Sequence, residues 1–599
     1  MLRLPRLFVL LALAAIAAPV WAQVDVQSPF LDDPDLFIDY VDTNASFWLD
    51  VYDDTRGGFY TNVSRDGEVI TAWGTNKDVL TQSRDAYAMV RAFQLTGNET
   101  YLTYARGALD FLYTHGWDSA FGGWFNRLTE TGGVIDINGQ KTAFIQHYAL
   151  LGPMAYVEAT GDAVDRAWLD QGMAHLDEHF WDDRTDLFGY YDRTSRTGSG
   201  PTDKSFNATV DAITTHALQL YLLTGEDRYR DRLLDLAANM QDRLVASMPD
   251  QAIGFAEKYD ADWQPLANER LTIMGHVLKT AWCLGRLHEV LGDPSYLADA
   301  ELLAQHVLDR GYDHEYGGPY KDFDRITGEM QLFGIPDTTK AWWQMEQAVT
   351  AGLELYRQTA DPQWLTMADE TLGFFMTYFQ DPVYGEVYPD RTRYGAGVPQ
   401  WGDHKGDGFK AAYHSVELGY YAYLHATLFV HNAEATLHYR FDAQPEARTI
   451  RLTPLAVRDD RLRLSAVLLD GQPYADYDAD TRTLTLPANV GGLFTVGFEN
   501  TAPVANEPAT APLAFALEAP APNPFADQTR LTYTLDATSP VRLSVFDLLG
   551  REIAVLAESE QAAGTHTALF DARTLSSGVY LVRLTTPAGT ATQRITQLR

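Results

Sequence analysis

Between residues 32 and 429 the chain alternates two kinds of helical pattern. One kind is largely apolar, as in QSRDAYAMVRAFQL and HVLKTAWCLGRLHEV. The other has one polar face, as in ETYLTYARGALDFLYTHG and PSYLADAELLAQHVLDRG. A helix that is apolar all round is buried, whereas a helix with one polar face lies at the surface. The alternation therefore predicts inner helices, each followed by an outer helix.

The alternation is part of a longer repeat. A helix-ending marker recurs at near-constant spacing as Thr96-Gly97-Asn98, Thr160-Gly161-Asp162, Thr224-Gly225-Glu226, Leu291-Gly292-Asp293 and Thr359-Ala360-Asp361. After each outer helix comes a turn rich in Gly and aromatic residues, which has the pattern of a short hairpin. Six such units, followed by a change of composition, predict an (α/α)6 barrel over residues 25–430. An open helical solenoid is the alternative.

The remainder of the chain divides into four segments. Residues 1–22 combine two Arg, an apolar run and small residues before the cleavage point, as in a secretory signal peptide. Residues 435–500 alternate apolar and polar positions and predict a small all-β, sandwich-like module. Residues 501–514 are rich in Ala and Pro and read as a linker, and residues 515–599 predict a second β module. No later stretch is long and apolar enough to span a membrane.

The net charge limits the partners that we expect, and the cysteine content limits the disulfides. The formal net charge of −35 disfavours nucleic acid and anionic membranes, so a neutral ligand is the better expectation. The single Cys283 allows no intramolecular disulfide.

Polar residues of the inner helices gather at one depth. Counting back from each marker, at about 1.5 Å per residue, places five side chains at nearly one level: Arg84, Gln146, Asp211, His276 and Glu346. The sixth inner helix carries His414 near its start, beside Lys410, Tyr413 and Glu417. Burying such groups unpaired would cost several kcal/mol apiece, roughly, so the ring predicts a site. Its apolar walls would come from Trp282, Trp342, Trp343 and Phe409.

At this ring the sequence resembles the N-acylglucosamine 2-epimerase and cellobiose 2-epimerase family. The matching residues are Lys77, Gln82-Ser83-Arg84, Gly275-His276, Trp282, Lys340, Trp342, Trp343, Glu346, Lys410 and Tyr413-His414. The resemblance implies an (α/α)6 barrel that moves a proton at C2 of a small reducing sugar, with no metal or nucleotide cofactor.

The same resemblance implies roles for the site residues. His276 and His414 would exchange the proton through an enediolate, and Arg84 would hold the oxyanion. Residues expected to contact the sugar are Trp282, Trp342, Glu346, Asp211, Lys279, Glu417, Phe409, Tyr413 and Lys410. Return of the proton to C2 would give an epimer and return to C1 a ketose, and the sequence leaves both open.

Three positions depart from the family pattern. The family has Glu three residues after the first His and Arg three residues after the second, whereas this chain has Lys279 and Glu417. We hypothesise that these two pair across the barrel, which would change which His has a carboxylate neighbour and exchange the acid and base roles. Asp211 stands where many relatives carry another His, which leaves assistance to ring opening undecided.

The last segment resembles the C-terminal sorting domain of the type IX secretion system. The resemblance rests on Pro522-Asn523-Pro524-Phe525, Asp547 to Arg551, Ala563-Gly564-Thr565-His566 and Ser577-Gly578-Val579-Tyr580. It implies that the type IX machinery is a partner and that the protein is secreted or held at the cell surface.

Two other function classes fit the same residues. A glycoside hydrolase on this barrel would use paired carboxylates, for which Asp211 and Glu346 are candidates. A non-catalytic glycan-binding surface protein would use the barrel and its β module for binding alone.

Overall fold

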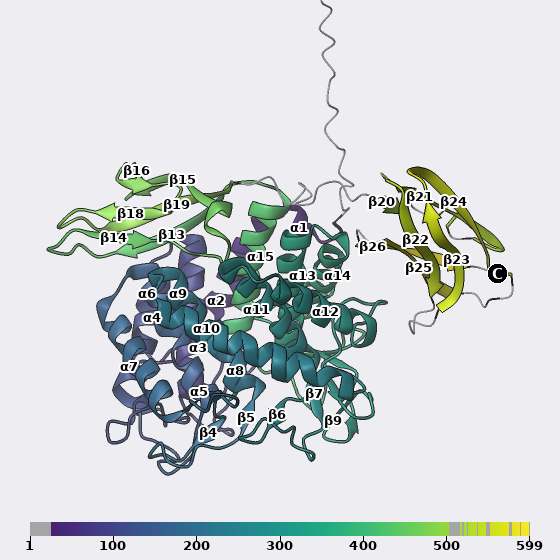
Figure 1. The fold of residues 1–599 in the computed structure, drawn as a ribbon. Coiled ribbons are helices and arrows are strands. Elements are labelled where there is room, and N and C mark those ends of the chain that lie inside the picture. The colour runs from purple at the N-terminus through teal and green to yellow at the C-terminus, as the bar shows by residue number, and fades with distance from the viewer. Residues whose placement is uncertain are drawn as a thin grey trace, which may run out of the picture. The chain divides into compact units, whose positions relative to one another are not determined.

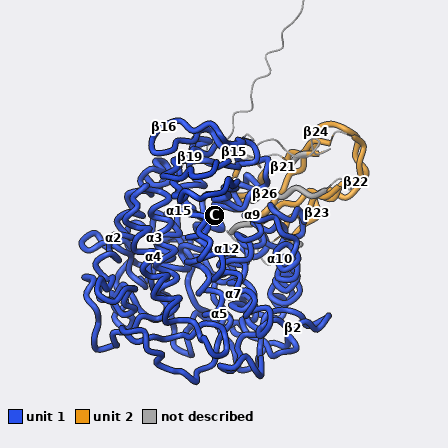
Figure 2. Tube along the Cα trace, turned by 90° about the vertical axis from the view of Figure 1, so that its left-hand side faces the viewer, with its two compact units in different colours: residues 1–505 blue, residues 506–599 orange. Residues whose placement is uncertain are grey.

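The structure, a computed structural model, describes residues 26–501 and most of residues 515–597. Within the latter range it leaves out 518–519, 521, 524, 536, 547–551, 574, 576–577 and 587–588. The predicted signal peptide at 1–22, all but the first residue of the predicted linker at 501–514, and the motif at 547–551 lie outside the described residues. The chain forms two compact units, residues 1–505 and residues 506–599 (Figure 2).

Helices of the first unit form an inner and an outer layer (Figure 1). The buried inner helices are α3 (Val79–Thr96), α5 (Ala143–Tyr148), α6 (Leu151–Thr160), α8 (Phe206–Ala212), α9 (Leu218–Thr224), α11 (Met274–Leu291), α13 (Trp342–Thr359) and α15 (Tyr413–His425). The partly exposed outer helices are α2 (Leu36–Leu49), α4 (Thr100–Phe111), α7 (Ala163–His179), α10 (Asp227–Asn239), α12 (Pro294–Arg310) and α14 (Pro362–Tyr378). A short helix α1 (Pro29–Asp32) precedes them.

The inner layer is a closed ring. Helix α15, the last inner helix, packs against α13 before it and also against α3, the first inner helix. It also contacts α2, which supplies its outer partner from the start of the chain. The first unit is therefore an α/α barrel rather than an open solenoid.

The recurring markers end the inner helices. Gly97, Gly161, Gly225 and Gly292 follow α3, α6, α9 and α11 with φ between 66° and 81°, a left-handed conformation that glycine adopts without strain. Ala360 takes the same place after α13 with φ 56°. The sequence marker thus reports a backbone requirement at each helix end.

Buried lysines anchor five of the hairpins. Four of them lie two residues before an inner helix, and Lys405 lies in the segment leading to α15. Each one pairs with the first Asp of a hairpin, at 2.8 to 3.3 Å: Lys77–Asp53, Lys141–Asp118, Lys204–Asp182, Lys340–Asp313 and Lys405–Asp381. The hairpin near Phe255 lacks this pair, and there Thr272 Oγ1 accepts the Phe255 N–H at 3.3 Å. Lys77 and Lys340, which belong to the family resemblance, therefore hold the scaffold.

Short two-stranded pairings link successive repeats. The pairs are β1 (Lys141–Thr142) with β4 (Arg193–Thr194), β2 (Trp181–Asp182) with β3 (Gly189–Tyr190), β5 (Lys204–Ser205) with β6 (Lys258–Tyr259), β7 (Leu271–Ile273) with β8 (Asp322–Asp324), β9 (Gln331–Leu332) with β10 (Ile335–Pro336), and β11 (Thr339–Ala341) with β12 (Asp390–Thr392). Most of them join the strand entering one inner helix to a hairpin further along the chain, so the repeats are held together at this end of the barrel.

Residues 435–500 form β-structure packed on the barrel. A four-stranded antiparallel sheet has the order β13 (Ala435–Phe441), β19 (Gly492–Asn500), β15 (Leu462–Leu469), β16 (Gln472–Pro473), and a three-stranded sheet has the order β14 (Arg448–Arg451), β18 (Thr483–Leu486), β17 (Tyr477–Asp478). Buried and partly exposed positions alternate along β13, whose buried side shares the barrel's hydrophobic core. His438 Nδ1 lies 3.2 Å from the Gln94 carbonyl near the end of α3. The module therefore covers the end of the barrel where the inner helices finish.

The second unit is all-β in its described residues. One sheet has the order β20 (Phe515–Leu517), β21 (Gln528–Leu535), β24 (Gly564–Asp571), and the other β23 (Glu552–Gln561), β22 (Ser539–Phe546), β25 (Gly578–Thr586), β26 (Gly589–Gln597). Leu531, Leu543 and Val582 belong to its own hydrophobic core. None of the described helices of the chain is long and apolar enough to cross a membrane.

Candidate active site

A cavity of about 370 Å³ opens where the inner helices begin. Its walls come from the first two turns of the inner helices α3, α5, α8, α11, α13 and α15 and from the segments leading into them: Arg84, Phe144, Tyr148, Asn207, Asp211, Ile273, His276, Lys279, Trp342, Trp343, Phe409 and His414. The volume is within the range of small-molecule sites, and the mixture of aromatic walls with few polar groups is typical of them.

His276 and His414 both line this cavity, although they come from different helices. The ring of Trp343 lies near both imidazoles, with centroid distances of 5.2 Å to His276 and 6.1 Å to His414. Two groups able to exchange protons therefore line one open cavity.

His276 is oriented by a carboxylate that the sequence did not indicate. Its Nδ1 lies 2.8 Å from Glu257 Oε2, and its ring stacks on Phe206 with centroids 3.8 Å apart. Glu257 Oε1 accepts the Ile273 N–H at 2.9 Å, which fixes the carboxylate. Because Nδ1 is used in this way, Nε2 is the nitrogen left for a substrate.

His414 has a weaker carboxylate contact and a more buried ring. Its Nδ1 lies 3.3 Å from Glu346 Oε2. Burial holds the pKa of His414 well below the usual value of 6.5, and the nearby cations Arg84, Lys279 and Lys410 lower it further. The imidazole is therefore neutral at neutral pH.

Arg84 brings a cation to the same cavity. Its Nη1 donates to the Phe409 carbonyl, and its guanidinium lies 4.2 Å from the ring of Tyr148 and 5.3 Å from that of Tyr413. In the part of the chain that the structure describes, no carboxylate forms an ion pair with Arg84. Its charge is available to a negative group on a ligand.

Lys279 pairs with Asp211, so the hypothesis that it pairs with Glu417 is wrong. Its Nζ lies 2.6 Å from Asp211 Oδ1 and 3.2 Å from the Tyr148 hydroxyl. Asn207 donates to the other oxygen of Asp211 at 2.9 Å. Glu417 instead accepts from the Tyr87 hydroxyl at 3.1 Å. Each histidine has a carboxylate neighbour, Glu257 for His276 and Glu346 for His414, and one oxygen of Glu417 also lies within 4.8 Å of a ring nitrogen of His414.

Several residues expected at the cavity lie behind its walls. Trp282 is fully enclosed and donates from Nε1 to Gln347 at 2.7 Å. It follows His276 by six positions, which at about 100° per residue turns it to another face of α11. The other residues expected at the site but absent from the wall are Lys410, paired with Glu386 at 2.8 Å, Gln146, bound to the backbone of Trp124, and the buried Tyr413, Glu346 and Glu417.

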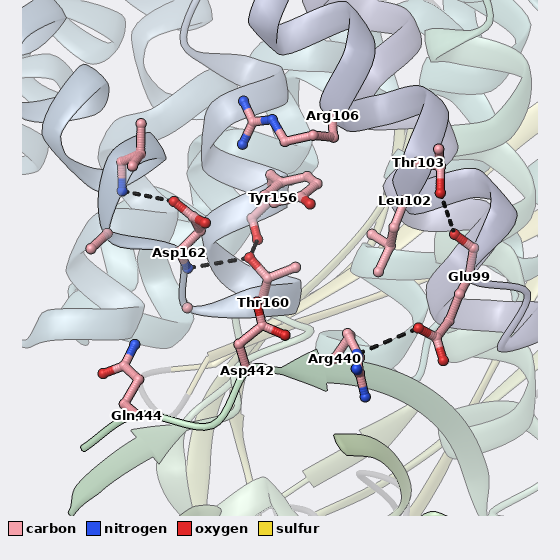
Figure 3. Close-up of a pocket in the computed structure, with 13 residues that line it drawn as sticks. Glu99, Leu102, Thr103, Arg106, Tyr156, Thr160, Asp162, Arg440, Asp442 and Gln444 are labelled. Carbon is pink, nitrogen blue, oxygen red and sulfur yellow. Dashed lines mark hydrogen bonds and ion pairs between the residues drawn. The ribbon is translucent and has the colours of Figure 1, made fainter. Parts of the chain in front are cut away.

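A second, more open pocket of about 510 Å³ lies where helices α4, α6 and α7 meet β13 (Figure 3). Arg440 and Asp442 lie opposite Tyr156 in this view. Its charges are largely used within the protein, since Arg106 pairs with Asp165 at 2.6 Å and Arg440 with Glu99 at 3.4 Å. It holds neither imidazole of the first cavity.

The fold and the cavity define a class: an α/α barrel with a ligand site at the start of its inner helices. Residues 58–415, more than half of the chain, match the N-acylglucosamine 2-epimerase (GlcNAc 2-epimerase) family. The chain belongs to that family, which confirms the resemblance inferred from the motifs. Residues 521–597 match the secretion system C-terminal sorting domain, which indicates export to the cell surface or the medium.

Individual relatives are distant but span the barrel. The chain is 22% identical to a cellobiose 2-epimerase of Bacteroides fragilis over 354 residues, which covers 57% of this chain and 86% of that protein. A solved cellobiose 2-epimerase from Spirochaeta thermophila superposes with a TM-score of 0.58 at 22% identity, covering 66% of this chain and 98% of that one. A solved D-mannose isomerase gives a TM-score of 0.59 at 19% identity, covering 66% and 99%. At these identities the solved structures show the fold.

Proposed function

We propose that the protein is an exported sugar 2-epimerase or aldose–ketose isomerase that acts on a reducing mono- or disaccharide, on a barrel of six helix pairs. The observation that carries the proposal is the placement of His276 and His414, from separate helices, on one cavity beside Arg84. The family membership supports the same reaction class.

The chemistry begins at C2 of the open-chain sugar, whose proton is acidified by the C1 carbonyl. His414 is neutral and removes that proton through Nε2, which leaves an enediolate with its negative charge on O1. Arg84 stabilises this charge because its own is not balanced by a carboxylate. His276, with Glu257 on Nδ1, returns a proton from the opposite face.

The site of reprotonation decides the product. Delivery to C2 from the opposite face inverts that centre and gives the epimer. Delivery to C1, with the O2 proton moving to O1, gives the ketose. In the reverse direction the two imidazoles exchange roles, so each must pass through both protonation states in a cycle.

The walls of the cavity suit a sugar. Trp342 and Trp343 present apolar faces, and Asn207, Asp211 and Lys279 offer polar groups for hydroxyls. Phe409 also lines the cavity and is 70% exposed, which makes it a platform for a second sugar unit beyond the reducing one.

The hydrolase alternative is less well supported. Paired carboxylates must face the bond that breaks. Asp211 is bound by Lys279, and Glu346 is fully buried behind the cavity wall. We also propose that residues 1–22 direct the chain to the periplasm and that the C-terminal unit then serves the type IX machinery.

A panel of reducing mono- and disaccharides tests the function. Each sugar is incubated with the full-length protein, and the products are resolved by anion-exchange chromatography and proton NMR. A new epimer or ketose of unchanged chain length is expected. Release of shorter sugars would instead indicate a hydrolase, and binding without any turnover would indicate a glycan-binding protein.

A further inference from the structure

Two carboxylates lie together behind His414. Glu346 of α13 is fully buried and Glu417 of α15 is 4% exposed. One oxygen of each and one ring nitrogen of His414 all lie within 4.8 Å of one another. The position of Glu417 is one where the family pattern has the opposite charge.

The hydrogen bonds of these two carboxylates leave one oxygen without a donor at normal hydrogen-bond geometry. Glu346 accepts from the Thr350 hydroxyl at 2.7 Å and from the Gln347 side chain, and it lies beside His414 Nδ1. Glu417 Oε1 accepts from Tyr87. Glu417 Oε2 is buried and accepts no hydrogen bond of normal geometry among the described residues, although the Tyr413 hydroxyl near this carboxyl lowers its pKa. A buried carboxylate oxygen without a donor is costly, unless a proton is bound there.

The surrounding cations do not balance two negative charges. Three of them are paired with carboxylates of their own, at 2.6 to 2.8 Å: Lys279 with Asp211, Arg286 with Glu354, and Lys410 with Glu386. Lys279 and Arg286, the two cations that act on both carboxyls, are therefore already balanced, whereas Lys410 and Arg84, which is unpaired among the described residues, act on His414. Burial raises the pKa of both carboxyls, and the charge of Glu417 raises that of Glu346 further.

We propose that Glu346 and Glu417 hold one proton between them, and that Glu417 acts through Glu346 as a positioning residue for His414. With one proton on the pair, an ionised oxygen remains to accept Nδ1–H, so Nε2 is the free base facing the cavity. Two ionised carboxylates would favour the imidazolium and remove the base. Two protonated ones would leave Nδ1–H without an anionic acceptor. The consequence for catalysis rests on the proposed function, whereas the shared proton does not.

A bound divalent cation is the competing explanation for this cluster. It would have to take Glu346 from the donors Thr350 and Gln347, and it would lie close to the cations that already act on His414. Those repulsions favour a proton over a dication.

Infrared spectroscopy of the ligand-free protein tests the proposal. In difference spectra at neutral pH, the wild type should show a carboxylic-acid C=O band that is lost in both Glu346→Gln and Glu417→Gln. Glu158→Gln, which removes a carboxylate paired with Arg91, should keep that band. Circular dichroism establishes that each variant is folded.

A failure of the shared-proton proposal can be distinguished from a failure of the proposed function, because the infrared measurement uses no substrate. A band that persists in both variants, or is absent from the wild type, overturns the shared proton. Calorimetric binding of Zn²⁺ that Glu417→Gln abolishes would overturn it in favour of a metal site.

If a substrate is turned over, Glu417→Gln should retain the acid limb of its pH–rate profile, because the amide reproduces the protonated member of the pair. Glu417→Lys should weaken activity, because it reverses the charge beside Glu346.

Discussion

The ammonium of Lys279 lies 2.6 Å from the carboxylate of Asp211, and both side chains are buried in the cavity wall. Each charge needs the other, because a lone buried charge is strongly unfavourable. We expect Lys279→Met or Asp211→Asn alone to lower the free energy of unfolding by about 3–5 kcal/mol.

The double variant Lys279→Met with Asp211→Asn should lose less than the sum of the two single losses, since it leaves no unpaired charge. Denaturant titration of the four proteins measures this. Additive losses would show that the pair does not act as a unit.

Trp282 and Trp342 provide a matched test of where the site ends. Trp282→Phe removes a hydrogen bond to Gln347 and should lower stability by about 1–3 kcal/mol, with little effect on KM. Trp342 lines the cavity, and its Nε1 has no hydrogen-bond partner among the described residues. Trp342→Phe should therefore leave stability nearly unchanged and raise KM. The reverse pattern would place Trp282 at the sugar.

Counting residues back from the helix ends predicted how deep in the barrel the site lies better than it predicted which side chains face it. Arg84, Asp211 and His276 lie on the cavity because equal distance from a helix end gives equal height in a barrel. The same count does not fix the rotation of a side chain about its helix axis. Gln146 and Glu346, counted to the same level, therefore lie behind the wall. Trp282, expected at the cavity from the family motif, is turned into the core by its helix.

The orienting carboxylate of His276 could not be found by motif. Glu257 lies in the one hairpin whose Lys–Asp anchor is missing, so no repeat register located it. The missing Lys–Asp pair was itself a signal in the sequence, because a hairpin without this structural contact can place a side chain at the active site instead. Lys77 and Lys340 show the converse, because their motif matches reflect hairpin anchoring rather than chemistry.

Ala360 tests the link between the repeat marker and backbone conformation. Its φ of 56° is unfavourable for a residue with a side chain, so Ala360→Gly should raise the free energy of unfolding by about 1 kcal/mol. Gly225 has φ 66° and no atom within 4 Å of an added Cβ, so Gly225→Ala should lower stability by a similar amount through backbone strain alone. Thermal unfolding of both variants checks this, and changes of the same sign would refute it.

Acid should destabilise the barrel through buried histidines. His147 lies 3.1 Å from His216, and burial lowers the pKa of His147 to about 4. The unfolded chain, with a His pKa near 6.5, then binds more protons, so stability falls as pH drops from about 6.5 to about 4. His147 accounts for roughly 3 kcal/mol of that fall. In His147→Gln the fall should be smaller by that amount, and an unchanged pH dependence would contradict the assignment.

Proton exchange at C2 of the sugar tests the central claim most directly. A convertible sugar is incubated in deuterated buffer with the wild type, His276→Asn, His414→Asn and the double variant, and deuterium at C2 of substrate and at C1 or C2 of product is followed by proton NMR. The wild type should incorporate solvent deuterium, each single variant should lose net conversion, and the double variant should exchange nothing. Undiminished exchange in the double variant, or conversion by the wild type without any deuterium incorporation, would contradict proton transfer by these two imidazoles.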